Sequence, residues 1–535
     1  MMNDIKTATI EDMRNQISDL LEQVKFLTEQ NLMLRQRLFG RKSEQKIDVV
    51  SNGQISLFNE VEVESESATP EPELEEITYR RKKLKGKREL DFCGLPTQQI
   101  IHELPETERI CQECGKPLHA CGHDVLRREL TVIPAQYIVT EYIQTVYACR
   151  DCEENDVQVP MVKAEVPAPV ISGSGIASPS LIAHIANQKY TLALPLYRQE
   201  QEFSRNNLNL SRQTMANWLI YVSEHWLVPI YNTLKSILLL MYVLHADETS
   251  VQILKEEGKP AKSKSYMWLY RTGCDAGHPI VLYDYQPNRK HINAKSFLES
   301  FSGYLHSDGY QAYHNLPSGI TIVGCWAHLR RKFADILKSI PDYNKPGSLA
   351  KRGMEYCDKL FDMEREYAKL PTDDNFQARY DVRLKNSKPI MCEFFDWVES
   401  VYGKNIMATP KSNMGKALAY AINQRTQLEN VLRDGRLELS NNRAERSIKP
   451  FVIGRKNWLF SNTEKGADAS AMFYSIIETA KENGLKPYDY LKYIFEIAPN
   501  LALTRNPDAV GALLPWNVPD DCRVSTQLAI ARNTQ

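Results

Sequence analysis

Three acidic residues stand where carboxylates could share metal ions, although they lie far apart in the chain. Asp247 follows the alternating, β-rich segment 242–246, so we expect it on a strand inside a sheet. Asp308 closes a second segment of this kind. Glu445 lies in the first turn of a predicted helix and could point toward the sheet. Hard divalent ions such as Mg²⁺ or Mn²⁺ prefer oxygen ligands, and a pair of them supports in-line attack at phosphorus.

The segments around the two aspartates predict how a sheet would bring them together. Further strands are predicted at 266–270 and 280–283, between Asp247 and Asp308. Three strands in series, then a helix, then a strand beside the first is the order of an RNase H-like sheet. We therefore expect a multidomain α/β protein with an RNase H-like catalytic core, in which Asp247 bridges two ions while Asp308 and Glu445 hold one each.

The third acid has alternatives. Asn442 and Glu445 also fit a capping box, in which the glutamate only returns a hydrogen bond to the cap. Glu438 is the nearest rival for its position, and Glu248 would point to the opposite face of the strand from Asp247. Basic side chains crowd the same helix and would position phosphates; they are Arg446, Lys449, Arg455 and Lys456.

Two CxxC motifs predict a zinc ribbon. Cys111 and Cys114 are separated by 34 residues from Cys149 and Cys152, and two such knuckles complete the tetrahedron of a structural zinc site. The segments 131–133 and 137–139 alternate in polarity and are predicted to be strands that join the knuckles. Two alternatives remain: Cys121 or His123 replaces one ligand, or the motif is duplicated without metal.

Residues 10–38 predict a coiled coil, because apolar side chains recur at the a and d positions of about four heptads. Asn31 occupies an a position, where a polar residue favours a parallel two-stranded register. We therefore expect a homodimer or higher oligomer. The alternative is an amphipathic helix packed on its own domain. The a positions are Ile10, Ile17, Val24 and Leu38, and the d positions are Met13, Leu20, Leu27 and Leu34.

A charged linker follows. Residues 60–76 contain eight Glu and no basic residue, a composition that does not fold alone, and residues 80–88 carry seven positive charges. The basic run could contact a DNA backbone or pair with the acidic linker. Further along, residues 206–218 resemble a turn followed by a helix that Ser211 caps. This pattern is typical of a helix-turn-helix, in which Arg212 would contact DNA. A polar turn between two core-packed helices gives the same pattern.

These patterns divide the chain into regions of different composition. The near-zero net charge of −1 neither proves nor excludes nucleic acid as a partner. No apolar run is long enough to span a bilayer and the first residues lack the order of a signal peptide, so we expect a cytoplasmic, nucleoid-associated protein. The expected regions are a coiled coil (1–45), a linker (46–90), a zinc-binding ribbon (91–165), a helical DNA-binding region (170–235), a catalytic domain (236–490) and a C-terminal segment (491–535).

The ordered motifs resemble one known family, the DDE transposases of the insertion sequence 66 family. The resemblance runs almost from end to end. Besides the coiled coil and the double CxxC, the matching segments are 38–44 (LFGRKSE), 194–198 (LPLYR), 245–249 (HADET), 307–310 (SDGY), 325–333 (CWAHLRRKF), 441–450 (NNRAERSIKP), 454–460 (GRKNWLF) and 514–517 (LPWN).

This resemblance implies that Asp247, Asp308 and Glu445 are the catalytic triad and that residues 330–435 form a helical insertion. It implies a bacterial mobile element, whose double-stranded ends and target are the DNA partners and which encodes accessory proteins. The Cys325-x-x-His328 motif at the start of the insertion fits a buried thiol and a hydrogen-bonded histidine as well as metal or DNA contact, and it is not assigned as a zinc site. Ser440 departs from the aspartate that the family commonly carries, but its hydroxyl can still cap a helix.

Three functions follow from these observations. The first is an active transposase that cleaves DNA and joins strands. The second is a binding protein without enzymatic activity that occupies DNA through its ribbon and basic segments; retention of all three acids argues against it. The third is an RNase H-like nuclease that cleaves without joining, against which the coiled coil and the long insertion argue.

Overall fold

The computed structural model describes residues 116, 136–147, 162–173, 176–340, 345–370, 376–405, 408–501, 503 and 506–524. The described residues fall into two compact units, one within 59–166 and one within 167–524. Several predictions lie outside the described residues: the coiled coil at 10–38, the acidic linker and basic run, the four CxxC cysteines, and Cys121 with His123.

Among its described residues, the smaller unit contains one short pair of strands. β1 (Val146–Tyr147) pairs antiparallel with β2 (Val162–Lys163), and the side chain of Gln144 donates a hydrogen bond of 2.7 Å to the carbonyl of Ala164. The predicted strand at 137–139 is wrong, because these residues form no strand in the structure. Ile138 and Val139 are 83% and 92% exposed, so their apolar character does not reflect a packed sheet face.

The larger unit is mixed α/β, as predicted, and is built on a six-stranded sheet. The sheet order is β5-β4-β3-β6-β7, with β8 paired to the far end of β3. β3, β4 and β5 are antiparallel, whereas β6 and β7 run parallel to β3. The strands are β3 (Val243–Lys255), β4 (Lys264–Thr272), β5 (Val281–Gln286), β6 (Gly303–His306), β7 (Ile320–Val323) and β8 (Ser461–Thr463).

The predicted strand order within this sheet is confirmed. Three strands follow one another, then helix α9 (His291–Phe297), then β6 beside the first strand. Alternation in β4 sends Trp268 and Tyr270 to one face and Met267 and Leu269 to the other, and all four are fully buried. Each contributes roughly 2 to 3 kcal/mol through its removal from water.

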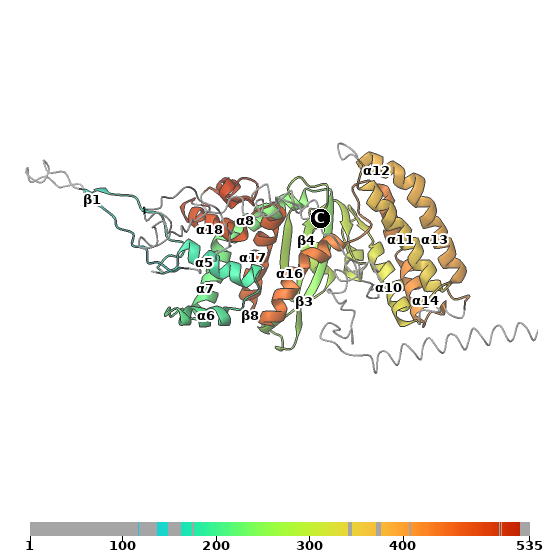
Figure 1. Cartoon of the computed structure of the whole chain (residues 1–535), viewed down its shortest axis with the longest axis horizontal. Helices are drawn as coiled ribbons and strands as arrows, with labels where there is room; N and C mark the ends of the chain where they lie inside the picture. Colours follow the sequence, from blue (N-terminus) through green and yellow to red (C-terminus); the bar gives the residue numbers. More distant parts are fainter. Residues whose placement is uncertain are drawn as a thin grey trace, which may run out of the picture. The chain divides into compact units, whose positions relative to one another are not determined.

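Helices cover both faces of the sheet (Figure 1). α16 (Asn442–Trp458) crosses one face and packs against β3 and β4, and the hydroxyl of Tyr283 on β5 donates to the Ser447 carbonyl of this helix. On the opposite face the ring of Phe297 in α9 stacks on Tyr270 at 3.8 Å, and Trp268 meets Tyr313 of η4 (Gln311–Asn315).

The backbone at both edges of the sheet is also covered. Ser475 and Thr479 of α17 (Glu464–Glu482) accept hydrogen bonds from the backbone N–H groups of β5 at 2.7 and 3.0 Å. At the other edge, the side chain of Asn430 donates to the Ile322 carbonyl of β7 at 2.8 Å. Neither edge therefore presents a free ladder there for another strand to join.

Helices before and after the sheet pack together at one end of it. Ser211 accepts a hydrogen bond of 3.1 Å from the N–H of Thr214, which confirms the predicted cap. The elements are α5 (Pro179–Ala186), η2 (Asn187–Thr191), α6 (Leu196–Arg205), α7 (Arg212–Val222), η3 (Ser223–Leu227), α8 (Val228–Leu239), α18 (Pro487–Ile497), η9 (Ala498–Asn500), η10 (Pro507–Leu513) and η11 (Asp520–Cys522). Among the described helices, none is long and apolar enough to cross a membrane.

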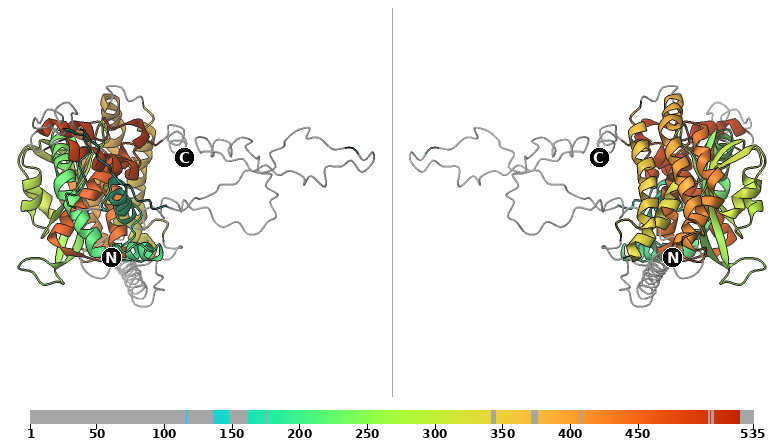
Figure 2. Two further views of the ribbon diagram at one scale, coloured as in Figure 1. Left: turned by 90° about the vertical axis from the view of Figure 1, so that its left-hand side faces the viewer. Right: turned by 90° about the vertical axis from the view of Figure 1, so that its right-hand side faces the viewer.

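Between β7 and α16 the chain forms a helical bundle with its own core (Figure 2, yellow to orange). Phe333, Phe394 and Trp397 pack at its centre, and Gly353 brings α11 against the Phe333 ring, because an added Cβ would lie 2.7 Å from that ring. Its elements are α10 (Trp326–Ser339), α11 (Leu349–Tyr367), α12 (Phe376–Val382), η6 (Arg383–Ser387), α13 (Lys388–Val401), α14 (Asn413–Asn423), α15 (Arg425–Glu429) and η8 (Asn430–Arg433).

A buried arginine ties this bundle to the chain that leads into α16. Arg383 is 1% exposed, and its guanidinium binds the Glu364 carboxylate at 2.6 and 2.7 Å. It also donates to the carbonyls of Asp434 and Leu437 at 3.2 and 2.6 Å. The guanidinium therefore joins α11 to the segment just before the helix that carries Glu445.

We predict that Arg383→Ala lowers the free energy of unfolding of this bundle by about 3 kcal/mol, because removal of one partner leaves a buried carboxylate and carbonyls unpaired. Urea unfolding followed by circular dichroism measures the loss. The matched control is Arg365→Ala on α11, whose pair with Asp362 is exposed, and we expect a change of about 1 kcal/mol or less. Equal losses in the two variants would contradict the assignment.

Candidate active site

Asp247 lies on β3, and Asp308 lies just beyond the end of the neighbouring parallel strand β6. β3 and β6 pair in register, with His245 opposite His306, and each aspartate follows two residues after its histidine. Because adjacent strands lie about 4.8 Å apart, this register brings both carboxylates to one end of the pair. Asp247 is on β3, as predicted, and Asp308 stands just beyond the end of β6.

Glu445 reaches this place from α16. It lies in the first turn of the helix, is 8% exposed, and its backbone N–H bonds to the carbonyl of Asn441 at 3.2 Å. Asp247 interacts electrostatically with both Glu445 and Asp308. The structure thus brings together the three acids that the sequence singled out.

Asn441 connects the separate segments of the site. This residue is 1% exposed, and its amide nitrogen donates to the Ala246 carbonyl at 2.8 Å. Its side-chain oxygen lies 3.0 Å from Nδ1 of His245, and its backbone N–H donates to Cys325 Sγ at 3.2 Å. One residue therefore fixes the start of α16 against the strand that carries Asp247.

The electrostatics of Asp247 fit a position that receives cations. Burial and the carboxylates of Glu248, Glu445 and Asp308 raise the pKa of Asp247 well above its usual range. Its carboxylate accepts one hydrogen bond, 2.8 Å long, from the N–H of Glu248. Like charges at close range are costly unless a cation or a proton offsets them. Carboxylate oxygens are also the ligands that Mg²⁺ and Mn²⁺ prefer, so these residues fit a hard divalent ion.

The alternatives for the third acid are occupied elsewhere. Glu438 pairs with His245 at 3.2 Å and with Arg443 at 2.8 Å, and although burial opposes ionisation, these partners hold the pKa of Glu438 well below its usual range. Glu248 points to the other face, where it accepts hydrogen bonds from Arg289 at 2.8 Å and Tyr313 at 2.6 Å.

The capping-box alternative is wrong. Asn441, not Asn442, is the N-cap residue, and no side-chain hydrogen bond caps α16. The Glu445 carboxylate instead lies 3.3 Å from the Arg331 guanidinium and 3.5 Å from Nε2 of His328. The carboxylate therefore points toward α10, which carries both of these partners, and not toward the start of its own helix.

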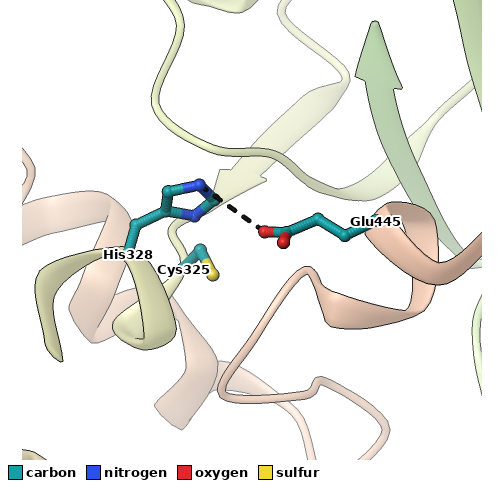
Figure 3. A group of neighbouring side chains, drawn as sticks. All are labelled: Cys325, His328 and Glu445. Carbon is teal, nitrogen blue, oxygen red and sulfur yellow. Dashed lines mark ion pairs between the residues drawn. The ribbon is translucent and has the colours of Figure 1, made fainter. Parts of the chain in front are cut away.

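Cys325 and His328 lie beside Glu445 (Figure 3). One ligand atom from each of these three buried residues lies within 4.8 Å of the other two. Burial alone would lower the pKa of His328, but Cys325, Glu445 and Asp308 raise it to about 10. The buried thiol and the paired histidine of one sequence interpretation are both present, and the Glu445 carboxylate lies 3.5 Å from the histidine as a third member of the group.

The predicted phosphate-binding residues occupy different positions along their helices. Arg446 is exposed on α16, and Arg455 donates to Thr249 of β3 at 3.1 Å. Lys449 is partly exposed and Lys456 exposed on the same helix, which continues through Pro450. Arg212 is committed in part to its neighbours, because its backbone N–H donates to Glu200 at 2.9 Å and its guanidinium lies over Tyr197.

Two residues near the acids were not singled out from the sequence. Arg331 contacts Glu445, and Tyr420 of α14 donates to the Asp308 carbonyl at 3.2 Å. Arg331 stands in the 325–333 motif, so its place six residues after Cys325 was an available signal. No sequence signal pointed to Tyr420, because its contact with Asp308 depends on how the helical bundle packs against the sheet.

The central part of the chain, residues 174–469, matches a family model described as Transposase IS66 family. The match covers more than half of the chain and includes Asp247, Asp308 and Glu445. The chain belongs to the IS66 transposase family. The expectation drawn from the sequence motifs is thereby confirmed.

Other IS66 models match on either side of this region. The zinc-finger binding domain of transposase IS66 covers 108–153 and includes all four CxxC cysteines, which supports a structural zinc. The IS66 C-terminal element covers 475–516, and a model described as Transposase C of IS166 homeodomain covers 26–96.

Two relatives align with this chain along nearly their whole length. Uncharacterized protein y4jD of Sinorhizobium fredii (strain NBRC 101917 / NGR234) is 30% identical over 526 residues, which is 95% of this chain and 96% of the relative. Uncharacterized protein y4qI of the same strain is 29% identical over 522 residues, 94% of this chain and 90% of the relative.

We predict that Asn441→Ala lowers the free energy of unfolding by about 3 kcal/mol, because the Ala246 carbonyl and Nδ1 of His245 lose a buried partner. Urea unfolding followed by tryptophan fluorescence measures this change. Asn457→Ala is the control on the same helix, since its amide makes one exposed hydrogen bond, to the Ala193 carbonyl, and we expect about 1 kcal/mol or less. A loss no larger than that of the control would refute the connecting role of Asn441.

Proposed function

We propose that this chain is a DNA transposase that cleaves the ends of a bacterial insertion sequence and joins them to target DNA. The observation that carries the proposal is the proximity of Asp247, Asp308 and Glu445, which come from a strand, from the residues just after a neighbouring strand and from a helix, far apart in the sequence. Membership in the IS66 transposase family supports the same reaction class.

We further propose that the sheet is an RNase H-like core. Three antiparallel strands followed by a helix and two parallel strands, in the order β5-β4-β3-β6-β7, support this assignment. The acids then stand where that architecture presents carboxylates to a shared pair of ions. On this proposal, the bundle between β7 and α16 is an insertion between the second and third acids.

The acids would hold two Mg²⁺ or Mn²⁺ ions, Asp247 contacting both and Asp308 and Glu445 one each. When bound, such ions activate the attacking oxygen and stabilise the leaving oxygen of an in-line displacement. Water first cleaves a phosphodiester bond to free a 3′-hydroxyl, and that hydroxyl then attacks a phosphorus of the target strand. No covalent bond to the protein is required. Asn441 keeps the Glu445 turn beside Asp247 during both steps.

Phosphate groups of the bound DNA would meet the basic side chains of α16. Arg446 is exposed in the turn that carries Glu445, and Arg455 extends along β3 near Thr249. Lys449 and Lys456 lie on the same helix. Such contacts fix the position of a strand and do not read its sequence.

Recognition of the element ends is assigned to the N-terminal half of the chain. α6 and α7, with Arg212 at the start of the second helix, support a helix-turn-helix-like role. The ribbon with Cys111, Cys114, Cys149 and Cys152 would hold structural zinc. Dimerisation through the coiled coil would bring two active sites to paired ends. Accessory proteins encoded by the same element would be further partners.

We predict that Asp247→Asn reduces cleavage of DNA carrying the terminal repeats by on the order of 10³-fold or more, because a ligand to both ions is lost. DNA binding, measured by gel shift without divalent metal, should change little. Unfolding stability should not fall, since the substitution removes a charge from a crowded group of acids. The control is Asp520→Asn, whose side chain is 99% exposed, and which should cleave normally.

A strand-transfer assay separates the proposal from its two rivals. A transposase joins the cleaved 3′ end to a second DNA molecule, whereas a nuclease of the same architecture only cleaves. Binding without either reaction in Mg²⁺ or Mn²⁺ would support the non-enzymatic protein and overturn the proposal.

A further inference from the structure

We propose that Cys325, His328 and Glu445 form a further metal site, adjoining the proposed catalytic ions, that takes a thiophilic divalent ion of the zinc class. The site joins the first turn of α10 to the first turn of α16. It shares Glu445 with the proposed pair of hard ions but adds a sulfur and an imidazole nitrogen, and ion binding there does not depend on the proposed function.

The geometry is close to that of a bound ion. The three ligand atoms lie within 4.8 Å of one another, and all three residues are buried. Zinc bonds of about 2.0 to 2.3 Å place tetrahedral ligands roughly 3.3 to 3.8 Å apart. Shifts of about 1 Å, within the reach of side-chain rotation, would therefore complete the site. Figure 3 shows the three side chains pointing toward one another from α10 and α16.

The sulfur of Cys325 lies at the start of α10 and accepts a backbone hydrogen bond. Cys325 is the N-cap of the 14-residue helix α10, so the positive end of the helix dipole faces the thiol. The backbone N–H of Asn441 donates to Sγ at 3.2 Å. Sulfur is a ligand that ions of the zinc class prefer.

Two polar atoms of the cluster lack hydrogen bonds among the described residues. Nδ1 of His328 and Oε1 of Glu445 are buried without a hydrogen-bond partner, although Oε1 lies 3.5 Å from Nε2 of the same histidine. Buried polar atoms without partners are costly, and metal coordination is one of the ways in which a protein satisfies them.

The combination of ligands selects the class of ion. Sulfur and imidazole nitrogen with one carboxylate oxygen favour Zn²⁺, Co²⁺ or Cd²⁺, whereas Mg²⁺ prefers oxygen alone. Three protein ligands, with water as the fourth, is a common zinc arrangement. Such an ion would tie Glu445 to α10 and so fix the bundle against the core.

The test is a Co²⁺ titration of the full chain, followed by the thiolate charge-transfer absorption and by equilibrium dialysis. Wild-type protein should bind one more equivalent of Co²⁺ than either Cys325→Ser or His328→Asn. The serine variant keeps an acceptor for the Asn441 N–H, and circular dichroism verifies that both variants fold. Cys392→Ser, which removes an exposed cysteine on α13, is the control and should bind as the wild type does.

A ribbon variant and a catalytic variant separate the possible outcomes. A variant with serine in place of Cys111, Cys114, Cys149 and Cys152 should retain a charge-transfer band from a single thiolate, and adding Cys325→Ser should remove it. Asp247→Asn should keep the additional equivalent even though it lacks cleavage activity. Equal Co²⁺ binding by the wild type, Cys325→Ser and His328→Asn would overturn the site and leave the proposed transposase function untouched.

Discussion

The site depends on holding like charges together. Asp247, Asp308 and Glu445 repel one another, and burial adds to the cost of ionising Asp247. A flexible chain would let them separate. Here Asp247 stands on β3, Asp308 stands just beyond the end of the parallel strand β6 beside it, and the third stands on a helix packed across β3. The paired strands and the packed helix keep these three residues close enough to interact electrostatically.

The helix that carries the third acid is held by polar contacts that converge from several segments. Asn441 joins β3, Cys325 and its own helix, while Glu438 pairs with His245 and Arg443. His245 in turn stacks on His306 at 4.3 Å, so the two strands and the start of α16 share one buried network. Networks of this kind specify one arrangement because each unmet partner is costly in a region of low dielectric constant.

Local patterns predicted the elements, but they did not predict the contacts between distant elements. Alternation located Asp247 on a strand, and a serine at the right place located the cap at Ser211. The Asn442 capping box failed because Asn441 finds its partners in β3, nearly two hundred residues away. Apolar alternation at 137–139 failed because no packed sheet covers those residues in the described chain. The convergence of Cys325, His328 and Glu445 was also beyond local pattern, since one member lies beyond the whole bundle.

The closed borders of the sheet bear on what happens when many copies gather on one DNA molecule. Hydroxyls of α17 and the amide of Asn430 bind backbone groups that an open border would offer to a neighbour. Crowded copies therefore cannot extend each other's sheets by strand addition at those positions. Contacts between copies at those positions would instead use helical or side-chain surfaces.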